Sequence, residues 1–402
     1  MTVADRRRSF RQRLFLSFLA VLALASARQL VVSPSHGQDF RDFFAAATLI
    51  TQGGNPYDTN ALAREQDRLY NQPGHFQPGD RDYYDALPYP QGPWVALAIV
   101  PSTFLPWQAA YILYLGAALA ALAASAWTLT RLLAFRSELI TPAMGAVLAS
   151  PVAFINLFQG QPVPFLLAAF VGAWALQRRA RPFLCGTLLA VGWIKPHIGL
   201  PLVLVAILLE QSSIRRLLAG FCTGTVLLFG LAAFLIRNVL LDWPRTVLGQ
   251  WSGALQQADL ASVNAFYYPA LSGALRQLVV AVVVLAAVGY AVWTFRQHKA
   301  PLTRALTLLV LTFLAAPYAH SYDTLLLLPV VLVVVGPHLA GWRDPAVELA
   351  LWAFAAIPIL YFAGFHIGYF NGFTAIPVTL LAFAWHRFGG ATSRRSSVPV
   401  AA

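Results

Sequence analysis

Residues 182–214 read PFLCGTLLAVGWIKPHIGLPLVLVAILLEQSSI, an almost wholly apolar segment between two arginine clusters. As one helix it would be about 50 Å long, whereas the hydrocarbon core of a bilayer is about 30 Å thick. A single helix would also leave the charge of Lys195 near the middle of the membrane, where its insertion costs roughly 2.5 to 3.5 kcal/mol of free energy. We therefore expect a hairpin that breaks at WIKPHIGLP. Lys195, Pro196 and His197 would lie at its tip, in a water-filled recess where irregular backbone is tolerated.

The whole chain has the same apolar character. Of its 402 residues, 58% are hydrophobic and 11% are charged, and the mean hydropathy is +0.63. Because water-soluble domains carry about 25% charged residues, that class is excluded and an all-α polytopic integral membrane protein is predicted. The two cysteines, Cys185 and Cys222, both lie inside apolar runs, so the sequence offers neither a disulfide framework nor a cysteine metal site.

About twelve membrane spans are expected, since an apolar run of about 20 residues crosses the bilayer as a helix. They are 13–32, 107–130, 140–158, 162–177, 182–194, 197–211, 217–236, 271–295, 304–319, 322–340, 346–365 and 373–387. With a cytosolic N-terminus, the arginine-rich turns between spans all face the cytosol, as the positive-inside rule requires. Both termini are then cytosolic, and the net charge of +12 is explained without a nucleic-acid partner.

The chain is expected to form one membrane domain over residues 1–402. Residues 1–12 would be a cytosolic N-terminus, 33–106 a long first outer loop, 107–387 the remaining spans and 388–402 a disordered cytosolic tail. The first span has a second interpretation, because RRRSFRQRLFLSFLAVLALASA has the basic start, apolar centre and small residues of a cleaved signal peptide. In both interpretations, the loop that follows lies outside the cytosol.

Candidate polar residues gather on the outer face of this topology, whereas the inner turns carry mostly arginine. In chain order they are Asp39 and Asp42 in the first outer loop, Gln159 and Gln161 in FQGQP, Lys195 in WIKPH, Arg245 in the loop 237–270, and His320, Tyr322 and Asp323 in AHSYD.

Five motifs in this order carry a family resemblance: DFRDFFAAATLITQGGNPYD, PYPQGPWVALAIVPSTFLP, FQGQPVPFLLAAF, WIKPHIGLPLVLV and AAPYAHSYDTLLLLP. Over residues 37–330 the chain resembles glycosyltransferase family 87 of the GT-C superfamily, which includes the alpha-mannosyltransferases of mycobacterial lipomannan and phosphatidylinositol mannoside synthesis. The resemblance implies a GT-C fold and a polyprenyl-phosphate-linked sugar donor. It also implies a lipid-linked or glycan acceptor, and a site on the outer face of the bacterial cytoplasmic membrane among its lipids. QGQPVP departs from the usual family motif, which leaves the sugar and the acceptor open.

The resemblance implies a catalytic base at Asp39, the first Asp after the first span. One carboxylate near the acceptor hydroxyl suffices, because a phosphate leaving group departs without strong acid assistance. On a helix over 38–50 along the membrane surface, Asp39 and Asp42 would share a face, with Arg41 turned away. The alternatives are that Asp39 caps this helix and that Asp42 is a carboxylate partner or part of a solvated face.

The resemblance also implies a functional histidine at His320, which could hydrogen-bond the donor phosphate, and a role for Lys195 as a point charge that neutralises this phosphate. As alternatives, His320 is an interfacial residue and Lys195 extends to the membrane interface. We therefore predict two catalytic residues, Asp39 and His320. The predicted substrate-binding residues are Asp42, Lys195, Gln159, Gln161, Tyr322, Asp323 and Arg245.

The sequence also allows three alternative interpretations. Asp39 and Asp42 could hold a divalent ion, but no dense group of Asp, Glu and His at ligand spacing accompanies them, so we expect no metal and no other cofactor. Twelve spans are also typical of a secondary transporter or a lipid flippase. Such proteins usually show internal repeats and mid-membrane ionisable residues, and this chain instead has one outer loop far longer than the rest. In a membrane scaffold without activity, Asp39 would be dispensable.

Overall fold

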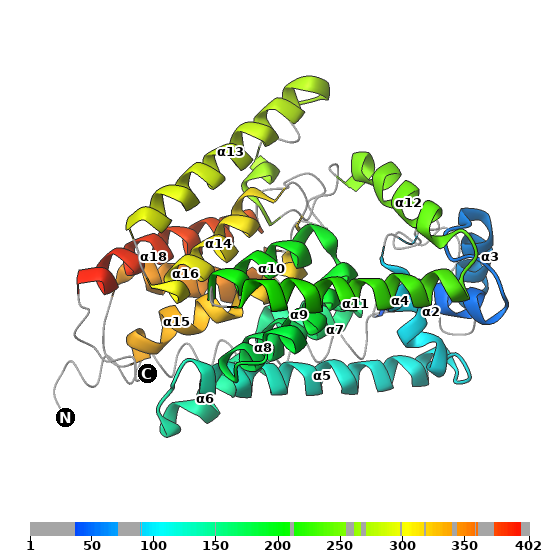
Figure 1. The fold of residues 1–402 in the computed structure, drawn as a ribbon, viewed down its shortest axis with the longest axis horizontal. Helices are drawn as coiled ribbons and strands as arrows, with labels where there is room; N and C mark the ends of the chain where they lie inside the picture. The colour runs from blue at the N-terminus through cyan, green and yellow to red at the C-terminus, as the bar shows by residue number, and fades with distance from the viewer. Residues whose placement is uncertain are drawn as a thin grey trace.

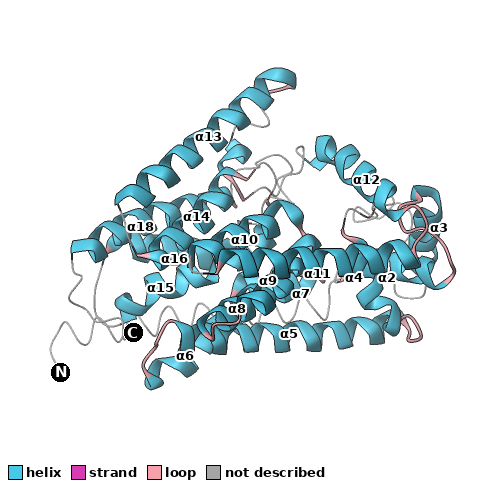
Figure 2. Cartoon of the chain, in the orientation of Figure 1, coloured by secondary structure: helices cyan, strands magenta, loops and turns pink. Residues whose placement is uncertain are grey.

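The computed structural model describes residues 37–70, 89, 91–148, 150–209, 213–254, 261–266, 271–297, 300–316, 319–339, 344–357, 359–360 and 374–394. Across these ranges the regular structure is helical, with no strand (Figure 2). The expected cytosolic N-terminus, the first span with its signal-peptide alternative, and residues 395–402 of the expected tail lie outside the described residues.

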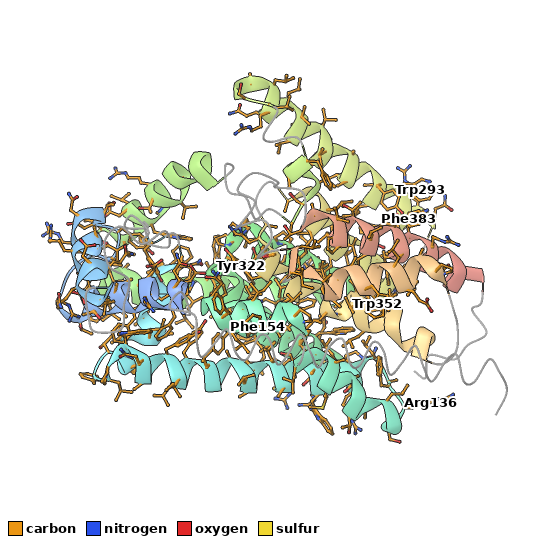
Figure 3. The ribbon with its side chains drawn as sticks, turned by 180° about the vertical axis from the view of Figure 1, so that it is seen from behind. Arg136, Phe154, Trp293, Tyr322, Trp352 and Phe383 are labelled. Atoms are coloured by element: carbon orange, nitrogen blue, oxygen red, sulfur yellow. The ribbon has the colours of Figure 1, made fainter. Side chains whose placement is uncertain are left out.

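Three helices in the described ranges are long and apolar enough to cross a membrane: α5 (Trp107–Leu132), α11 (Ile214–Leu235) and α13 (Gly273–Gln297). They match the predicted spans 107–130, 217–236 and 271–295. Their outer surfaces remain apolar, as at Leu278 and Leu285 of α13, and Trp293 of the same helix lies at the edge of the molecule (Figure 3). Because a water-soluble protein rarely exposes apolar surface on this scale, the membrane character is confirmed.

The remaining apolar helices are shorter. They are α6 (Ser137–Leu148), α7 (Pro151–Gln159), α8 (Val163–Arg178), α9 (Pro182–Leu189) with η2 (Ala190–Ile194), α10 (Pro196–Leu209), α14 (Pro301–Ala315), η5 (Ser321–Leu327) with α15 (Leu328–Leu339), α16 (Pro345–Ala355) and α18 (Ala375–Arg394). The predicted span 140–158 is bent by 41° between α6 and α7, where Pro151 cannot donate a backbone hydrogen bond. Length and composition therefore support three spans, or four with this bent pair, and twelve remains a prediction.

The predicted break in residues 182–214 is confirmed. Helix η2 ends at Ile194 and α10 begins at Pro196, with Lys195 between them. A Cβ added to Gly192 would lie 2.9 Å from the carbonyl oxygen of Gly199. Since seven residues of continuous helix would separate these positions by about 10 Å, the chain turns back on itself at Lys195.

The two segments predicted as long outer loops contain helices, of which only the one over 38–50 is predicted from the sequence. The loop 33–106 contains α2 (Gln38–Thr51), α3 (Thr59–Tyr70) and α4 (Pro93–Ile99) with η1 (Val100–Ser102), and the loop 237–270 contains α12 (Val239–Ala254) and η3 (Val263–Phe266). Helices α2, α3, α4 and α12 gather at one end of the molecule (Figure 1). They share a hydrophobic core with the adjoining ends of α5 and α11, separate from the larger core between α5 and α18.

Helix α2 was predicted over 38–50 and is present, but its expected position on a surface with Arg41 turned away is wrong. Arg41 is 1% exposed, and its guanidinium carbon lies 4.3 Å from the centroid of the Trp107 ring. The run Phe43 to Ala47 makes α2 apolar around most of its circumference, so the helix is buried on nearly every side. A planar guanidinium stacked on an indole ring is a favourable way to bury the one cation.

Candidate active site

The start of α2 packs against the turn between α7 and α8. The N–H of Gly37 donates to the carbonyl oxygen of Phe158 at 2.7 Å, and the hydroxyl of Tyr111 donates to Leu157 O at 2.5 Å. Gly160 ends α7 with a φ of 75°, and a Cβ there would lie 2.6 Å from the Cβ of Phe40. A glycine is therefore required twice over at this position, by its backbone conformation and by its neighbour.

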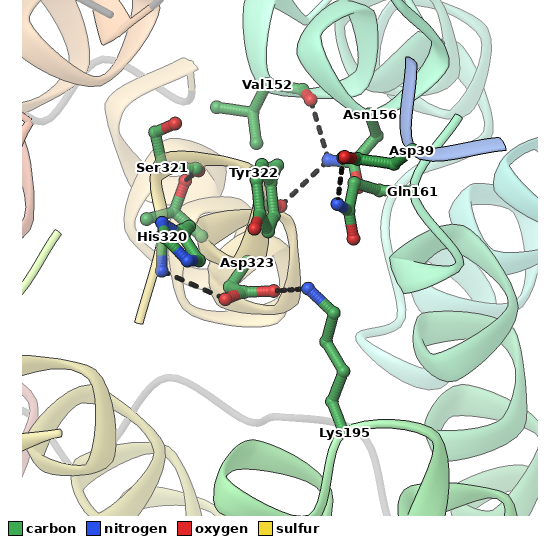
Figure 4. Close-up of polar contacts among 10 residues, drawn as sticks. Asp39, Val152, Asn156, Gln161, Lys195, His320, Ser321, Tyr322 and Asp323 are labelled. Carbon is green, nitrogen blue, oxygen red and sulfur yellow. Dashed lines mark hydrogen bonds and ion pairs between the residues drawn. The ribbon is translucent and has the colours of Figure 1, made fainter. Parts of the chain in front are cut away.

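Asp39 lies in the first turn of α2, half-buried, where its carboxylate accepts a hydrogen bond from Nε2 of Gln161 (Figure 4). The N-cap residue of the helix is Gly37, so the helix-cap alternative for Asp39 does not apply. The N-terminal end of a helix dipole favours a negative charge, which suits an ionised carboxylate at this place. Gln161 thus contacts the predicted base, and its predicted contact with substrate stays a prediction.

Asp42 is buried one turn further along α2. Burial raises the pKa of this carboxyl well above its ordinary value, the negative charge of Asp39 adds to the rise, and the positive charge of Arg41 opposes it. The fold therefore favours the neutral form of Asp42. A solvated face is excluded for this side chain, and its predicted contact with substrate stays a prediction.

Lys195 and Asp323 form a buried ion pair, with Nζ 2.8 Å from Oδ1 and side chains that are 4% and 0% exposed. The other carboxylate oxygen, Oδ2, accepts the backbone N–H of His320 at 2.9 Å. The ammonium also lies 4.2 Å from the centroid of the Tyr322 ring, and the rings of Tyr322 and His320 are 4.8 Å apart. Lys195 therefore does not extend to the membrane interface, because its charge is held inside the fold.

The segment from α7 into α8 connects these two groups. Nδ2 of Asn156, in the last turns of α7, donates to the carbonyl oxygen of Tyr322 at 2.8 Å and to that of Val152 at 2.9 Å, while Gln161 donates to Asp39. Gln159, at the end of α7, is buried in the same segment. The six-residue segment 156–161 thus contacts both α2 and η5, which are far apart in sequence (Figure 4).

Asn156 also belongs to this site, although it is not among the residues predicted to bind substrate. Its side chain is wholly buried in an otherwise apolar helix. A buried amide needs hydrogen-bond partners, and this requirement was the available signal. The partner could not be predicted, because Tyr322 lies 166 residues further along the chain.

Arg245 lies apart from this cluster. It belongs to α12, its side chain is 75% exposed, and its nearest carboxylate is Asp242 at 3.8 Å. Asp242 in turn accepts a hydrogen bond of 2.7 Å from Asn55, whose own Oδ1 accepts the N–H of Tyr57 at 3.0 Å. The GGNPYD motif is thus a turn that docks on α12.

No group of three or more His, Cys, Asp and Glu side chains in the described parts of the chain is arranged to hold a metal ion. The polar groups of the site are the carboxyl groups of Asp39, Asp42 and Asp323, the amides of Asn156, Gln159 and Gln161, and the side chains of Lys195, His320 and Tyr322. Together they can accept a proton from a hydroxyl at one end and donate hydrogen bonds to an anion at the other.

A comparison with protein families finds a match to the model described as Glycosyltransferase family 87 over residues 89–317. A search of curated proteins and a search of solved structures each found no match. The family match spans α4 to α14 and includes Gln161 and Lys195, whereas Asp39 and His320 lie outside the matched residues, so it supports the family and not the individual roles. Since the match covers more than half of the chain, this protein belongs to glycosyltransferase family 87 and is a membrane glycosyltransferase.

Proposed function

We propose that the protein transfers mannose or a similar sugar from a polyprenyl phosphate to a hydroxyl of a lipid-linked or glycan acceptor. The reaction would take place on the outer face of the bacterial cytoplasmic membrane, in a GT-C fold of twelve spans with both termini in the cytosol. The observation that carries this proposal is the junction at residues 156–161, where Gln161 contacts Asp39 and Asn156 contacts the η5 segment.

Asp39 is the general base in this proposal. The acceptor hydroxyl oxygen attacks the anomeric carbon of the sugar, and its proton passes to the Asp39 carboxylate. The bond from the anomeric carbon to the phosphate oxygen breaks, and the polyprenyl phosphate leaves with the bonding electrons. Attack opposite to the leaving group inverts the anomeric configuration. Gln161 donates to Oδ2 of Asp39 and so fixes the orientation of the carboxylate toward the acceptor.

The donor phosphate would bind at the other end of the site, near Lys195 and His320. The Lys195–Asp323 pair carries no net charge. It would therefore contribute oriented hydrogen-bond donors to phosphate binding more than a net positive charge. An ammonium has three N–H donors, and one donor of Lys195 is directed at Asp323. The others are of the kind that can donate hydrogen bonds to a phosphate oxygen. Asp323 and Tyr322 would then act by holding the ammonium in place.

The transporter or flippase alternative is less well supported, because the family is one of glycosyltransferases. It still makes a distinct prediction. A flippase moves a lipid-linked sugar across the bilayer and leaves the glycosidic bond intact, whereas a transferase breaks this bond and releases the polyprenyl phosphate.

The test supplies membranes that contain the protein, and matched membranes that lack it, with radiolabelled polyprenyl-phosphate sugars and a membrane glycolipid fraction as acceptor. We expect protein-dependent release of polyprenyl phosphate together with label in a new glycolipid. Movement of the intact donor across the bilayer, with no sugar transferred from any donor of the panel, would overturn the proposal in favour of a flippase.

A further inference from the structure

Helix α12 has an apolar stripe that no part of the described protein covers. Leu240, Leu241 and Leu248 are 49%, 59% and 70% exposed. Because positions 240, 244 and 248 repeat every four residues, these leucines and Pro244 lie on neighbouring positions of one helix face.

The adjacent face of α12 is buried against aromatic side chains. Trp243 packs with its ring centroid 5.3 Å from that of Trp94 and 6.3 Å from that of Trp193. Val239, one turn earlier, is also buried. The orientation of α12 is therefore fixed by the protein, and the apolar stripe is not the result of a loosely attached helix.

The stripe continues the apolar surface of a membrane span. Helix α11 ends with Phe234 and Leu235 exposed, and the chain turns through Arg237 into α12. Phe104 is similarly exposed just before α5 begins. The start of α5 lies at the same end of the molecule as the end of α11 (Figure 1). Exposed apolar side chains therefore lie on α12, at the end of α11 and just before the start of α5.

Two cations flank this stripe. Arg237 and Arg245 are both exposed, and the 3.8 Å separation of Arg245 from Asp242 is long for a hydrogen-bonded pair. A helix with an apolar face, bordered by arginines, typically lies in the plane of a membrane interface. Guanidinium groups bind phosphate oxygens well, with two parallel hydrogen bonds.

We propose that α12 lies in the membrane interface beside the ends of α5 and α11, with the leucines among the upper acyl chains and both arginines on the phosphates of bilayer phospholipids. Assignment of this interface to the outer leaflet rests on the proposed function, whereas the contact with lipid does not. The helix would anchor the region that contains α2 and Trp193, two residues before Lys195, at a fixed height against the membrane surface.

Spin labels on the full-length protein test this contact. In a background with Cys185→Ala and Cys222→Ser, labels would be placed at Leu241→Cys and Leu248→Cys, with Leu227→Cys on the exposed side of α11 and Arg64→Cys on α3 as references. In phosphatidylcholine vesicles, we expect labels 241 and 248 to collide with oxygen several-fold more, relative to a water-soluble nickel complex, than label 64. Their depth should be shallower than that of label 227. Labels at 241 and 248 that match label 64 would overturn the proposal.

The arginines are tested by a local lipid contact. A bimane on Leu241→Cys would be quenched by headgroup-labelled phosphatidylglycerol or phosphatidylcholine, and we expect stronger quenching by the anionic lipid. With Arg237→Gln and Arg245→Gln together, the quenching ratio should fall to about 1, and with the control Arg64→Gln it should not change. An unchanged ratio in the double variant would overturn the phosphate contact.

Discussion

The long helices and the broken helices of this protein differ in the polar residues that they carry. The middle parts of α5, α11 and α13 carry no charged side chain, and their apolar surfaces are exposed to the membrane. The candidate site lies where other helices start, stop or turn: Asp39 at the start of α2, Gln161 after α7, Lys195 between η2 and α10. A break frees backbone and admits polar side chains, which the membrane tolerates only inside the protein. The breaks therefore show where to look for chemistry.

The largest effect on stability is expected at the buried ion pair. Lys195→Met leaves the Asp323 carboxylate buried without its cation, which costs about 3 to 5 kcal/mol. The double variant Lys195→Met, Asp323→Leu should recover much of this loss. Val282→Ala on the exposed side of α13 is the matched change in a long helix and should stay within about 0.5 kcal/mol. Unfolding in detergent by denaturant measures all three, and equal losses in the two regions would contradict the comparison.

A glycine in each region gives a second contrast. Gly160→Ala forces a side chain into a left-handed conformation and against Phe40, so we expect a loss of about 1 to 3 kcal/mol and weaker activity, because α2 is displaced. Gly289→Ala in α13 meets no atom within 4 Å and should stabilise the helix by up to about 1 kcal/mol. Thermal unfolding of the two variants and the wild type tests whether Tm falls in Gly160→Ala and rises in Gly289→Ala.

The third prediction concerns the orientation of the base. Gln161→Met keeps the size of the side chain and removes the hydrogen bond to Asp39, a bond to a charged group worth about 1.5 to 3 kcal/mol. We expect kcat to fall about tenfold or more, with the KM for the donor unchanged, and Gln161→Glu to restore little, since it repels Asp39. A variant that raises the donor KM and keeps kcat would show that Gln161 binds substrate directly.

The smallest effect is a pH dependence at Asp42. Since burial raises the pKa of this carboxyl in the folded state, its neutral form contributes stability that is present below the unfolded pKa and is lost as pH rises through the folded value. Asp42→Asn keeps the neutral form at every pH, so its Tm should exceed that of the wild type at alkaline pH and approach it in acid. Asp67→Asn in α3 is the exposed control. A Tm difference that does not change with pH would contradict the raised pKa.

Much of the fold could be predicted from local signals. Apolar length predicted α5, α11 and α13, and a lysine followed by proline inside an apolar run predicted the break at Lys195, because both features oppose a continuous span. The helix α12 was missed because Asp242, Pro244 and Arg245 interrupt its apolar pattern.

The pairings of the site could not be predicted in this way. Gln161 and Asp39 are 122 residues apart, and Lys195 and Asp323 are 128 apart, so only the packing of the helices brings each pair together. The sequence placed these residues on one face but left their partners open. Gln161 and Asp323 are predicted substrate contacts, and the structure adds their partners within the protein: Gln161 donates to the predicted base Asp39, and Asp323 pairs with Lys195.

The role of Asp39 as the general base is tested by measuring donor binding and sugar transfer separately in Asp39→Asn. The purified protein in vesicles would be loaded with a radiolabelled donor found active for the wild type, and bound donor and a single turnover would be followed after acceptor is added. We predict donor binding within about twofold of the wild type and transfer slower by about 10²- to 10⁴-fold, the usual contribution of a general base. Undiminished transfer, or a loss of donor binding equal to the loss of transfer, would contradict Asp39 as the base.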